Sequence, residues 1–352
     1  MNSDNRKLGK KVAVIGAGAW GTTLALHAAR QGLKVTLWAR SAETAKNINA
    51  DGENRAFLPG AALAGDITAT PDAATALEGA GVVIWAVPSH GLRDVARALL
   101  PRAGDGTVHV SATKGIEDGT FMTMTNVLLS ETPGGISAKV GQLSGPSFAK
   151  EVALGLPTAV TLGMEDTGTA AAIQTLLSSP TFRIYTTPDV LGVELGGALK
   201  NVYAIAAGIC DGLELGLNAR AAFLTRALSE MTRFAVAMGA HPLTLSGLSG
   251  MGDLILTATG ELSRNRRVGL GIGAGESLGE ILKGRRDVAE GVKNAKSLMG
   301  LSKKTGFETP TATEVYRVLY EGKNPKQAMV ELLTRKLKTE INREILEGVV
   351  AK

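Results

Sequence analysis

The chain has 352 residues, with 38 basic and 33 acidic side chains and a formal net charge of +5. This length predicts two domains, and a composition of 44% hydrophobic and 20% charged residues excludes a disordered chain. The single Cys excludes a disulfide framework, and the small positive charge favours an anionic ligand over nucleic acid.

The sequence predicts a cytoplasmic protein with no membrane insertion. The first residues, MNSDNRKLGKK, are polar and lack the apolar stretch of a secretory signal, so residues 1–10 are expected to form a tail. The longest apolar run, residues 202–210, has nine residues, whereas a membrane span needs ~18–20.

Strands and helices alternate along residues 11–189. Short β-branched runs predict strands at 11–15, 34–38 and 82–87, with weaker strands at 107–110, 139–143 and 158–162. Helical spacing lies between them, at 19–31, 41–50, 90–100, 121–130 and 168–178. This alternation predicts an α/β, Rossmann-type doubly wound domain with a mostly parallel sheet and helices on both faces.

Strand signals fade from residue 189 onward. Helical patterns at 190–210, 219–238, 291–304, 310–321 and 331–346 predict an all-α domain over residues 190–346. The glycine-rich stretch 270–282 interrupts them and is expected to be a loop.

A glycine fingerprint, Gly16-x-Gly18-x-x-Gly21, follows the first strand and opens the first helix. The first glycine permits the tight turn, the second lets a pyrophosphate approach the backbone, and the third lets helix and strand pack closely. In this context the fingerprint predicts a dinucleotide site; the alternative is a turn that binds nothing.

Position 40 bears on the choice of dinucleotide. NAD-binding domains carry an acidic residue about 20 positions beyond the fingerprint, but the second strand here is followed by Arg40. A guanidinium can pair with a 2′-phosphate, which favours NADP over NAD, although a solvated Arg at a strand end stays an alternative.

Lys200 and Asn201 interrupt a stretch that is apolar almost all round, residues 191–208. A buried Lys has a lowered pKa, so it can exchange a proton near neutral pH, and Asn201 could orient a hydroxyl group. The alternative is a Lys side chain that reaches the surface.

Polar residues elsewhere suggest where an anion would bind. Lys114 and the Gly145-Pro-Ser147 turn follow predicted strands, and the carboxyl ends of parallel strands form ligand crevices. Glycines flank Asp253, which indicates close approach of a ligand or helix. The run 263–267 holds three Arg that suit a phosphate, although such a run is also typical of a solvated face. The four His residues show no metal-binding spacing.

In combination, these motifs resemble the soluble bacterial NAD(P)-dependent glycerol-3-phosphate dehydrogenase family. The resemblance runs from about residue 11 to 325 and rests on GAGAWGT (16–22), NRAFLPG (54–60), WAVPS (85–89), TKG (113–115), LSGPSFA (143–149), LKNVYA (199–204), GMGDL (250–254), SRN (263–265) and AEG (289–291).

The resemblance implies a Rossmann domain, an all-helical domain, a homodimer, and interconversion of dihydroxyacetone phosphate and sn-glycerol 3-phosphate for glycerophospholipid synthesis. It implies Lys200 as proton donor and acceptor. The implied substrate residues, with Asn201 added from the argument above, are Lys114, Gly145, Ser147, Asn201, Asp253, Ser263, Arg264 and Asn265. The implied cofactor residues are the fingerprint glycines with Ala19, Trp20, Arg40, Lys114, Ala149, Arg264, Val288 and Glu290.

Three other interpretations stay open at this point. The Arg run does not by itself separate phosphate from carboxylate, so a dehydrogenase of a 3-hydroxy acid is one alternative. A non-catalytic NAD(P) sensor with a structural Lys200 is another. The third is nucleic-acid binding through the basic stretches 264–267 and 283–286.

Overall fold

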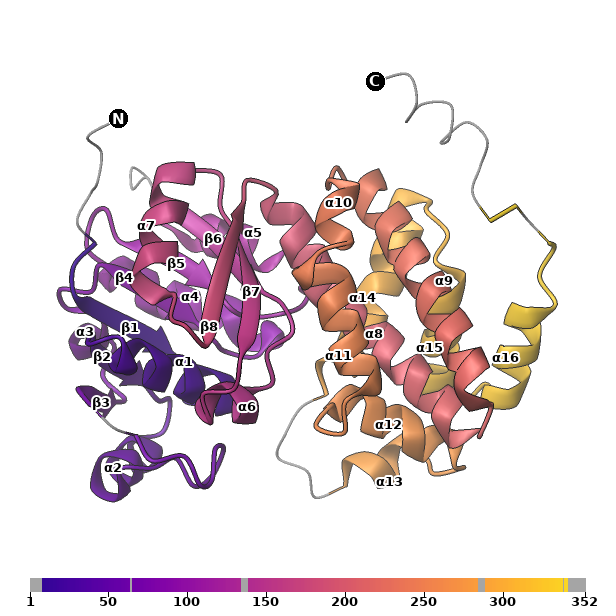
Figure 1. Cartoon of the computed structure of the whole chain (residues 1–352), viewed down its shortest axis with the longest axis horizontal. Helices are drawn as coiled ribbons and strands as arrows, with labels where there is room; N and C mark the ends of the chain where they lie inside the picture. The colour runs from indigo at the N-terminus through magenta and orange to yellow at the C-terminus, as the bar shows by residue number, and fades with distance from the viewer. Residues whose placement is uncertain (1–7, 64, 134–138, 284–288, 338, 341–352) are drawn as a thin grey trace.

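The computed structural model describes residues 8–63, 65–133, 139–283, 289–337 and 339–340. Figure 1 shows two units side by side, a sheet flanked by helices from the first half of the chain and a helical unit from the second half. Val288 and the stretch 341–346 of the last predicted helix lie outside the described residues.

In the described residues, the first unit is built on one eight-stranded sheet in the order β3-β2-β1-β4-β5-β6-β7-β8. All neighbouring strands are parallel except β6 and β7, so the predicted doubly wound, mostly parallel sheet is confirmed. The strands are β1 (Lys11–Ile15), β2 (Lys34–Trp38), β3 (Ile67–Thr70), β4 (Val82–Trp85), β5 (Val108–Ser111), β6 (Lys139–Ser144), β7 (Thr158–Gly163) and β8 (Phe182–Thr187).

Helices cover both faces of this sheet, which is why its inner strands are apolar without alternation. Val12 and Val14 of β1 face one buried cluster, and Ala13 and Ile15 face another. The helices are α1 (Ala19–Arg30), α2 (Ala42–Asp51), α3 (Ala73–Leu77), α4 (Leu92–Leu99), α5 (Met124–Glu131), α6 (Ala149–Ala153) and α7 (Thr167–Leu177).

The second unit is helical, with α8 (Val190–Gly212) buried at its centre. By length and composition α8 could cross a membrane, but 83% of its apolar window is buried inside this fold, so it is a core helix. Around it lie α9 (Gly216–Ala237), α10 (Pro242–Leu245), a π-helical turn (Leu248–Gly252), α11 (Asp253–Thr259), α12 (Arg264–Gly273), α13 (Leu278–Leu282), α14 (Glu290–Thr305), α15 (Pro310–Tyr320) and α16 (Pro325–Leu333).

The predicted loop at 270–282 is wrong, because α12 continues to Gly273 and α13 begins at Leu278. Glycines in this stretch and just before it allow two helix backbones to touch. A Cβ atom on Gly269 would lie 1.9 Å from the carbonyl oxygen of Ile205, and one on Gly273 would lie 2.6 Å from that of Ile209. On α8, Gly208 and Gly212 make the reciprocal close approach to α12.

Of the predicted helix at 331–346, residues 331–333 are helical and residues 334–337 are not. Helix α16 begins at Pro325, where Asn324 caps its first amides, and it ends at Leu333. Residues 334–337 are not helical, although their composition favours a helix. Leu337 is 94% exposed, so no packing in the described part of the chain holds the predicted helical face there.

Candidate active site

The fingerprint glycines sit at the end of β1, where the backbone turns into α1. Gly16 has φ +113°, and a Cβ there would lie 2.7 Å from the Ala86 carbonyl oxygen. A Cβ on Gly21 would lie 1.8 Å from the Gly16 carbonyl oxygen, so strand and helix pack too closely for a side chain. These are the tight-turn and close-packing roles expected of the first and third glycines.

Gly18 differs from the other two, because no described atom lies within 4 Å of its Cβ position. It is the N-cap of α1, and no side chain among the described residues caps the free amides there. The open backbone and the helix N-terminus together fit a pyrophosphate. Asn54 braces the loop, since its Nδ2 donates to the Ala17 carbonyl (2.9 Å) and to Thr22 Oγ1 (2.7 Å).

The ends of β2 and β4 place further candidate cofactor residues at the same edge of the sheet. Arg40 follows β2 and is exposed. Ser89, after β4, donates to Glu290 Oε2 (2.7 Å) at the start of α14. Burial lowers the pKa of His90, and Lys293 and Arg40 lower it further while Glu290 raises it, so these charges lie close together. The structure thus brings Arg40 and Glu290 to one region, from different domains.

A buried cluster of Lys200, Asp253 and Lys114 lies between the two units. Lys200 Nζ donates to Asp253 Oδ1 (2.8 Å) and Thr257 Oγ1 (2.6 Å), and Lys114 Nζ donates to Asp253 Oδ2 (2.5 Å). Lys114 also donates to the Gly145 carbonyl oxygen (3.1 Å). Lys200 is 6% exposed, so its side chain does not reach bulk water as the alternative interpretation required.

Glycines let the elements that carry this cluster meet. On α8, a Cβ at Gly196 would lie 2.6 Å from the Ser249 carbonyl oxygen in the π-helical turn before Asp253. A Cβ at Gly197 would lie 2.5 Å from Ser144 Oγ and 3.5 Å from Lys114 Cγ. Helix α8 therefore packs directly against both segments that supply the other members of the cluster, Asp253 and Lys114.

The electrostatics of the cluster favour proton exchange. Burial lowers the pKa of Lys200 to about 8; Asp253 raises it, and Lys114 lowers it further. Burial raises the pKa of Asp253, but the two ammonium groups outweigh that effect and hold the pKa below its usual value. The cluster thus pairs a stable carboxylate with an amine that can release its proton at mildly alkaline pH.

Asn201, the neighbour of Lys200, is held by a chain of amides. Asn265 Nδ2 donates to Asn201 Oδ1 (2.8 Å), and Asn265 Oδ1 accepts from the Gly291 amide (3.0 Å). Asn265 is 7% exposed. Its side-chain nitrogen holds Asn201 and its side-chain oxygen holds the start of α14.

The Arg residues of α12 take different positions. Ser263 caps the helix through the Arg266 amide (3.2 Å), and Arg266 pairs with Asp211 (2.7 Å). Arg264 is exposed, lies near enough to Lys200 to lower its pKa, and forms no ion pair within the described residues. Of the Arg run, Arg264 is therefore the residue available to an anion beside Lys200.

The structure brings most predicted site residues to the border between the units. Ser147 and Ala149 follow β6, where Ser147 Oγ donates to the Gly145 carbonyl (2.9 Å), and Ala149 accepts from Thr23 of α1 (3.1 Å). Trp20 Nε1 is buried and has no acceptor in the described part of the chain. The described residues contain no group of His, Cys, Asp and Glu that could hold a metal ion.

Two residues of this arrangement were not among the predicted site residues. Thr257 accepts from Lys200, and its position four residues after Asp253 places both side chains on one face of α11. Asn54 lies in a motif of the resemblance, but nothing local shows that its amide reaches the glycine loop.

A Rossmann sheet whose glycine loop has room for a pyrophosphate, together with a buried amine whose pKa is lowered to about 8, defines the class: an oxidoreductase that uses a nicotinamide dinucleotide. Comparison with known proteins narrows the class. Residues 11–170 and 189–330 match the family models for the N-terminal and C-terminal parts of NAD-dependent glycerol-3-phosphate dehydrogenase, so the chain belongs to that family.

Individual relatives agree with this assignment. The chain is 50% identical over 333 residues to glycerol-3-phosphate dehydrogenase [NAD(P)+] of Geobacter sulfurreducens, covering 95% of this chain and 99% of the relative. The counterpart from Syntrophobacter fumaroxidans is 48% identical over 335 residues, covering 95% and 98%. The crystal structure of glycerol-3-phosphate dehydrogenase from Coxiella burnetii superposes with a TM-score of 0.88 at 39% identity, covering 92% and 99%.

Proposed function

We propose that the chain interconverts dihydroxyacetone phosphate and sn-glycerol 3-phosphate with NADPH or NADH, and that Lys200 is the proton donor and acceptor. The observation that carries the proposal is the Lys200–Asp253–Lys114 cluster, in which one carboxylate joins a lysine from each of the two units. A bound nicotinamide dinucleotide supplies or accepts the hydride at the C2 carbon of the substrate.

The protein's own residues handle the proton and the charge. In the reductive direction Lys200 donates a proton to the C2 oxygen, and in the oxidative direction its neutral amine takes that proton back. Asp253 keeps the amine in place through a 2.8 Å hydrogen bond. Lys114 adds a second positive charge, which favours negative charge developing on the substrate oxygen.

Arg264 is the proposed phosphate ligand, because an exposed guanidinium with no ion pair to a described residue lies near Lys200. Asn201, fixed by Asn265, is proposed to orient a substrate hydroxyl. The cofactor residues proposed are the glycine loop with Ala19 and Trp20, together with Arg40, Lys114, Ala149, Arg264, Val288 and Glu290. Arg40 favours NADPH.

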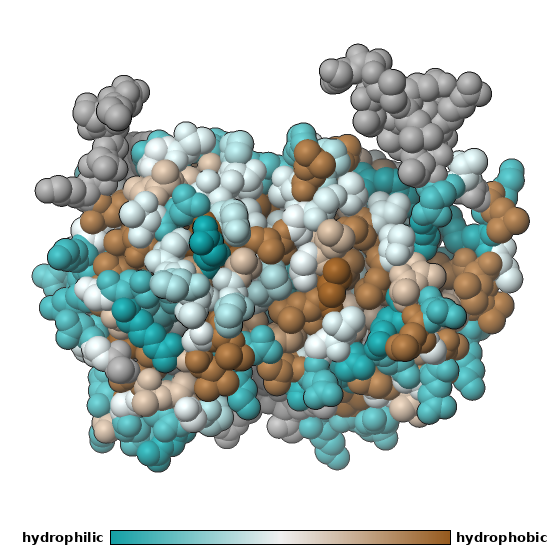
Figure 2. Space-filling view, viewed as in Figure 1, coloured by the Kyte–Doolittle hydropathy of each residue, from teal (hydrophilic) through white to brown (hydrophobic). Residues whose placement is uncertain are grey.

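The setting of the reaction is also a proposal. Family membership supports a cytoplasmic enzyme that feeds glycerophospholipid synthesis, with residues 11–189 and 190–346 as its two domains. A homodimer is supported by exposed apolar side chains on the helical unit, and Figure 2 shows apolar residues gathered on that side of the molecule. The exposed apolar side chains of the helical unit include Leu217, Val236, Leu243, Met251 and Ile255.

The test is the oxidation of NADPH and of NADH on addition of dihydroxyacetone phosphate, with a panel of carboxylated ketones for comparison. Turnover confined to the phosphorylated ketone supports the proposal, and turnover of a keto acid instead refutes it.

Lys200→Ala should lower kcat by about 10²-fold or more, in line with general acid–base catalysis. Lys303→Ala, which changes an exposed lysine on α14, is the matched control and should leave kcat unchanged.

A further inference from the structure

Glu194 is a buried carboxylate on α8 that the proposed reaction does not use. It is 5% exposed and forms no ion pair within the part of the chain that the structure describes. Its Oε1 accepts from the Thr125 amide (2.7 Å) and its Oε2 from the Thr125 hydroxyl (3.0 Å). The carboxylate of a helical-domain residue therefore binds the first turn of α5, which belongs to the Rossmann domain.

This contact replaces a cap that the sequence of α5 does not supply. Thr123 is the N-cap of α5, but its side chain accepts no hydrogen bond from the helix. A carboxylate at a helix N-terminus satisfies the free amides and interacts favourably with the helix dipole. Burial raises the pKa of Glu194 to about 7, although its hydrogen bonds with Thr125 lower it. The charge is thus costly to keep at this position, and the contact with α5 compensates part of that cost.

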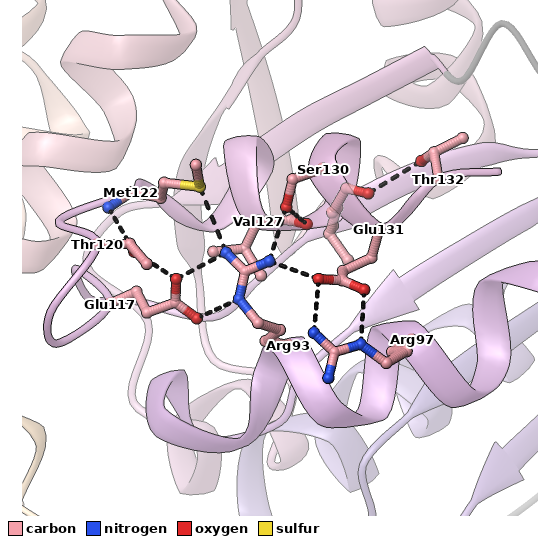
Figure 3. A network of polar contacts seen from close by, with 10 residues as sticks. Arg93, Arg97, Glu117, Thr120, Met122, Val127, Ser130, Glu131 and Thr132 are labelled. Atoms are coloured by element: carbon pink, nitrogen blue, oxygen red, sulfur yellow. Dashed lines mark hydrogen bonds and ion pairs between the residues drawn. The ribbon is translucent and has the colours of Figure 1, made fainter. Parts of the chain in front are cut away.

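The segment that ends at this cap carries Lys114. Residues 112–123 connect β5 to α5, and an antiparallel bridge between Ile116 and Thr123 closes the segment on itself. Figure 3 shows how Arg93 of α4 holds the other side, through ion pairs with Glu117 (2.7 Å) and Glu131 (2.5 Å). The segment also contacts the helical domain directly, because Ile116 packs in the buried cluster around α8 and Asp118 pairs with Lys296 of α14 (2.8 Å). The hydrogen bonds of Glu194 add to these contacts and tie the end of the segment at α5 to α8.

Lys200 follows Glu194 by six residues on the same buried helix, a rise of about 9 Å. Between them, Gly197 packs against Ser144 and the side chain of Lys114. Lys114 and Lys200 must reach the two oxygens of a single carboxylate, Asp253, from two different domains. The Glu194 contact with α5 holds α8 against the end of the Lys114 segment, and so contributes to the placement in which both lysines reach that carboxylate.

We propose that Glu194 is a positioning residue: its carboxylate ties the segment bearing Lys114 to the helix bearing Lys200, so that both ammonium groups meet Asp253. The inference rests on the proposed function, in which Lys200 moves the proton. Displacement of a reacting group by about 1 Å can cost about 10²-fold in rate, so loss of the contact should lower kcat more than it weakens binding of the dinucleotide.

Two substitutions separate position from charge. Glu194→Gln keeps the length of the side chain and a carbonyl oxygen for the Thr125 amide, so kcat should stay within about threefold of wild type. Glu194→Asp keeps the charge but withdraws the carboxylate by one methylene, so kcat should fall by about tenfold or more, with KM for NADPH within about threefold. The reverse order, with Asp active and Gln impaired, would overturn the proposal because charge would then be the requirement.

Glu230 provides a matched control. It is a buried carboxylate of α9, 3% exposed, and it caps α15 through the amides of Thr311 (3.1 Å) and Ala312 (3.2 Å). Both of these elements lie in the helical domain. Glu230→Asp should lower Tm by as much as Glu194→Asp while kcat stays within about threefold of wild type. Equal losses of kcat in both variants would reduce Glu194 to a structural role.

A second readout does not depend on turnover. In hydrogen exchange of the protein without ligands, peptides covering 112–128 should exchange faster in Glu194→Asp than in wild type, and they should be unchanged in Glu230→Asp. Unchanged exchange in Glu194→Asp would overturn the proposal. If Glu194→Asp does not fold, Thr125→Val tests the proposal instead, because it removes only the 3.0 Å hydrogen bond from the Thr125 hydroxyl. A loss of kcat of about fivefold supports the proposal, and unchanged kcat refutes it. Activity of the wild-type chain tests the proposed function separately, since every comparison here is made against it.

Discussion

The ammonium group of Lys200 is subject to two opposing effects, of which burial is the larger. Burial favours the neutral amine, and Lys114 favours it further, whereas the carboxylate of Asp253 favours the charged form. The resulting pKa of about 8 leaves both forms populated at physiological pH. A residue that must give a proton in one direction and take it in the other needs both forms.

The pH dependence of the two directions should therefore be opposite. Reduction of the ketone needs charged Lys200, so kcat in that direction should fall as pH rises through about 8. Oxidation needs the neutral amine, so kcat should rise through the same range. Steady-state assays in both directions at fixed ionic strength measure this.

Asp253→Asn tests the expected direction of these pH profiles. It removes the charge that raises the pKa of Lys200, so both profiles should move to lower pH. Profiles in which both directions rise or fall together would contradict the assignment of one shared donor and acceptor.

Arg40 bears on the choice of cofactor. Its exposed guanidinium lies just after β2, near Glu290 and His90, where it could bind the 2′-phosphate of NADPH. Arg40→Ala should raise KM for NADPH by about tenfold or more, the value of a charge-assisted hydrogen bond, and leave KM for NADH nearly unchanged. Arg183→Ala, at an exposed position on the edge strand β8, is the control. Equal increases for both dinucleotides would defeat this role.

At the residue scale, the environment of a side chain can be predicted from the sequence when neighbouring residues of the same segment determine it. The apolar surroundings of Lys200 are visible in α8 itself, so its burial could be predicted. The partners of the Arg run could not, because Arg264 and Arg266 lie two residues apart and so point to different sides of α12. Which of them meets Asp211 depends on where α8 lies, and that is a tertiary contact.

The contact between α8 and α12 is a close packing of two helix backbones that glycines permit. Gly208 and Gly212 on α8 face Gly269 and Gly273 on α12, so each helix presents glycines four residues apart. Low helix propensity explains why the sequence predicts a loop near residue 270, since Gly costs about 1 kcal/mol relative to Ala in a helix. Packing of the two backbones overrides that local preference.

Gly269→Ala should be strongly destabilising for this reason. Its Cβ would lie 1.9 Å from the Ile205 carbonyl oxygen and 2.7 Å from the Ile209 amide nitrogen, so α12 must move away from α8. We expect a loss of about 3 kcal/mol or more in the free energy of unfolding, measured by denaturant titration.

Gly279→Ala is the matched control for this substitution. Gly279 lies in helix α13, and no described atom lies within 4 Å of its Cβ position. Ala there should be neutral or stabilise by up to about 1 kcal/mol. Similar destabilisation by both substitutions would show that helix propensity rather than the α8–α12 contact explains the effect.

The strands show the same division between local and tertiary signals. The central strands β1 and β4 are continuous apolar runs because helices cover both faces, and the sequence predicts them. The edge strand β8 alternates between buried and exposed residues over only part of its length, and the sequence analysis did not predict it. The antiparallel pairing of β6 with β7 likewise leaves no local mark.

At the scale of the whole molecule, the proposed site exists only where the two domains meet. The glycine loop and Lys114 come from the Rossmann domain, whereas Lys200, Asp253 and Arg264 come from the helical domain. The sequence could predict both domains and most of these residues. It could not predict that one carboxylate, Asp253, joins a lysine from each domain.

This arrangement predicts how ligands stabilise the protein. In the proposed function, a dinucleotide alone contacts mainly the Rossmann domain, whereas a phosphorylated substrate bridges Lys114 and Arg264. NADPH together with sn-glycerol 3-phosphate, a pair that cannot turn over, should raise Tm by more than the sum of the two separate shifts, because each ligand completes the binding surface of the other.

Arg264→Ala separates this coupling from simple binding to one domain. The variant should keep most of the Tm shift caused by NADPH and lose the part that depends on sn-glycerol 3-phosphate. The substitution removes no ion pair to a described residue, so the fold itself should keep its stability. Differential scanning fluorimetry at several concentrations of each ligand measures both parts. Strictly additive shifts in the wild-type protein would mean that the two ligands bind independently, and the shared site between the domains would then have to be abandoned.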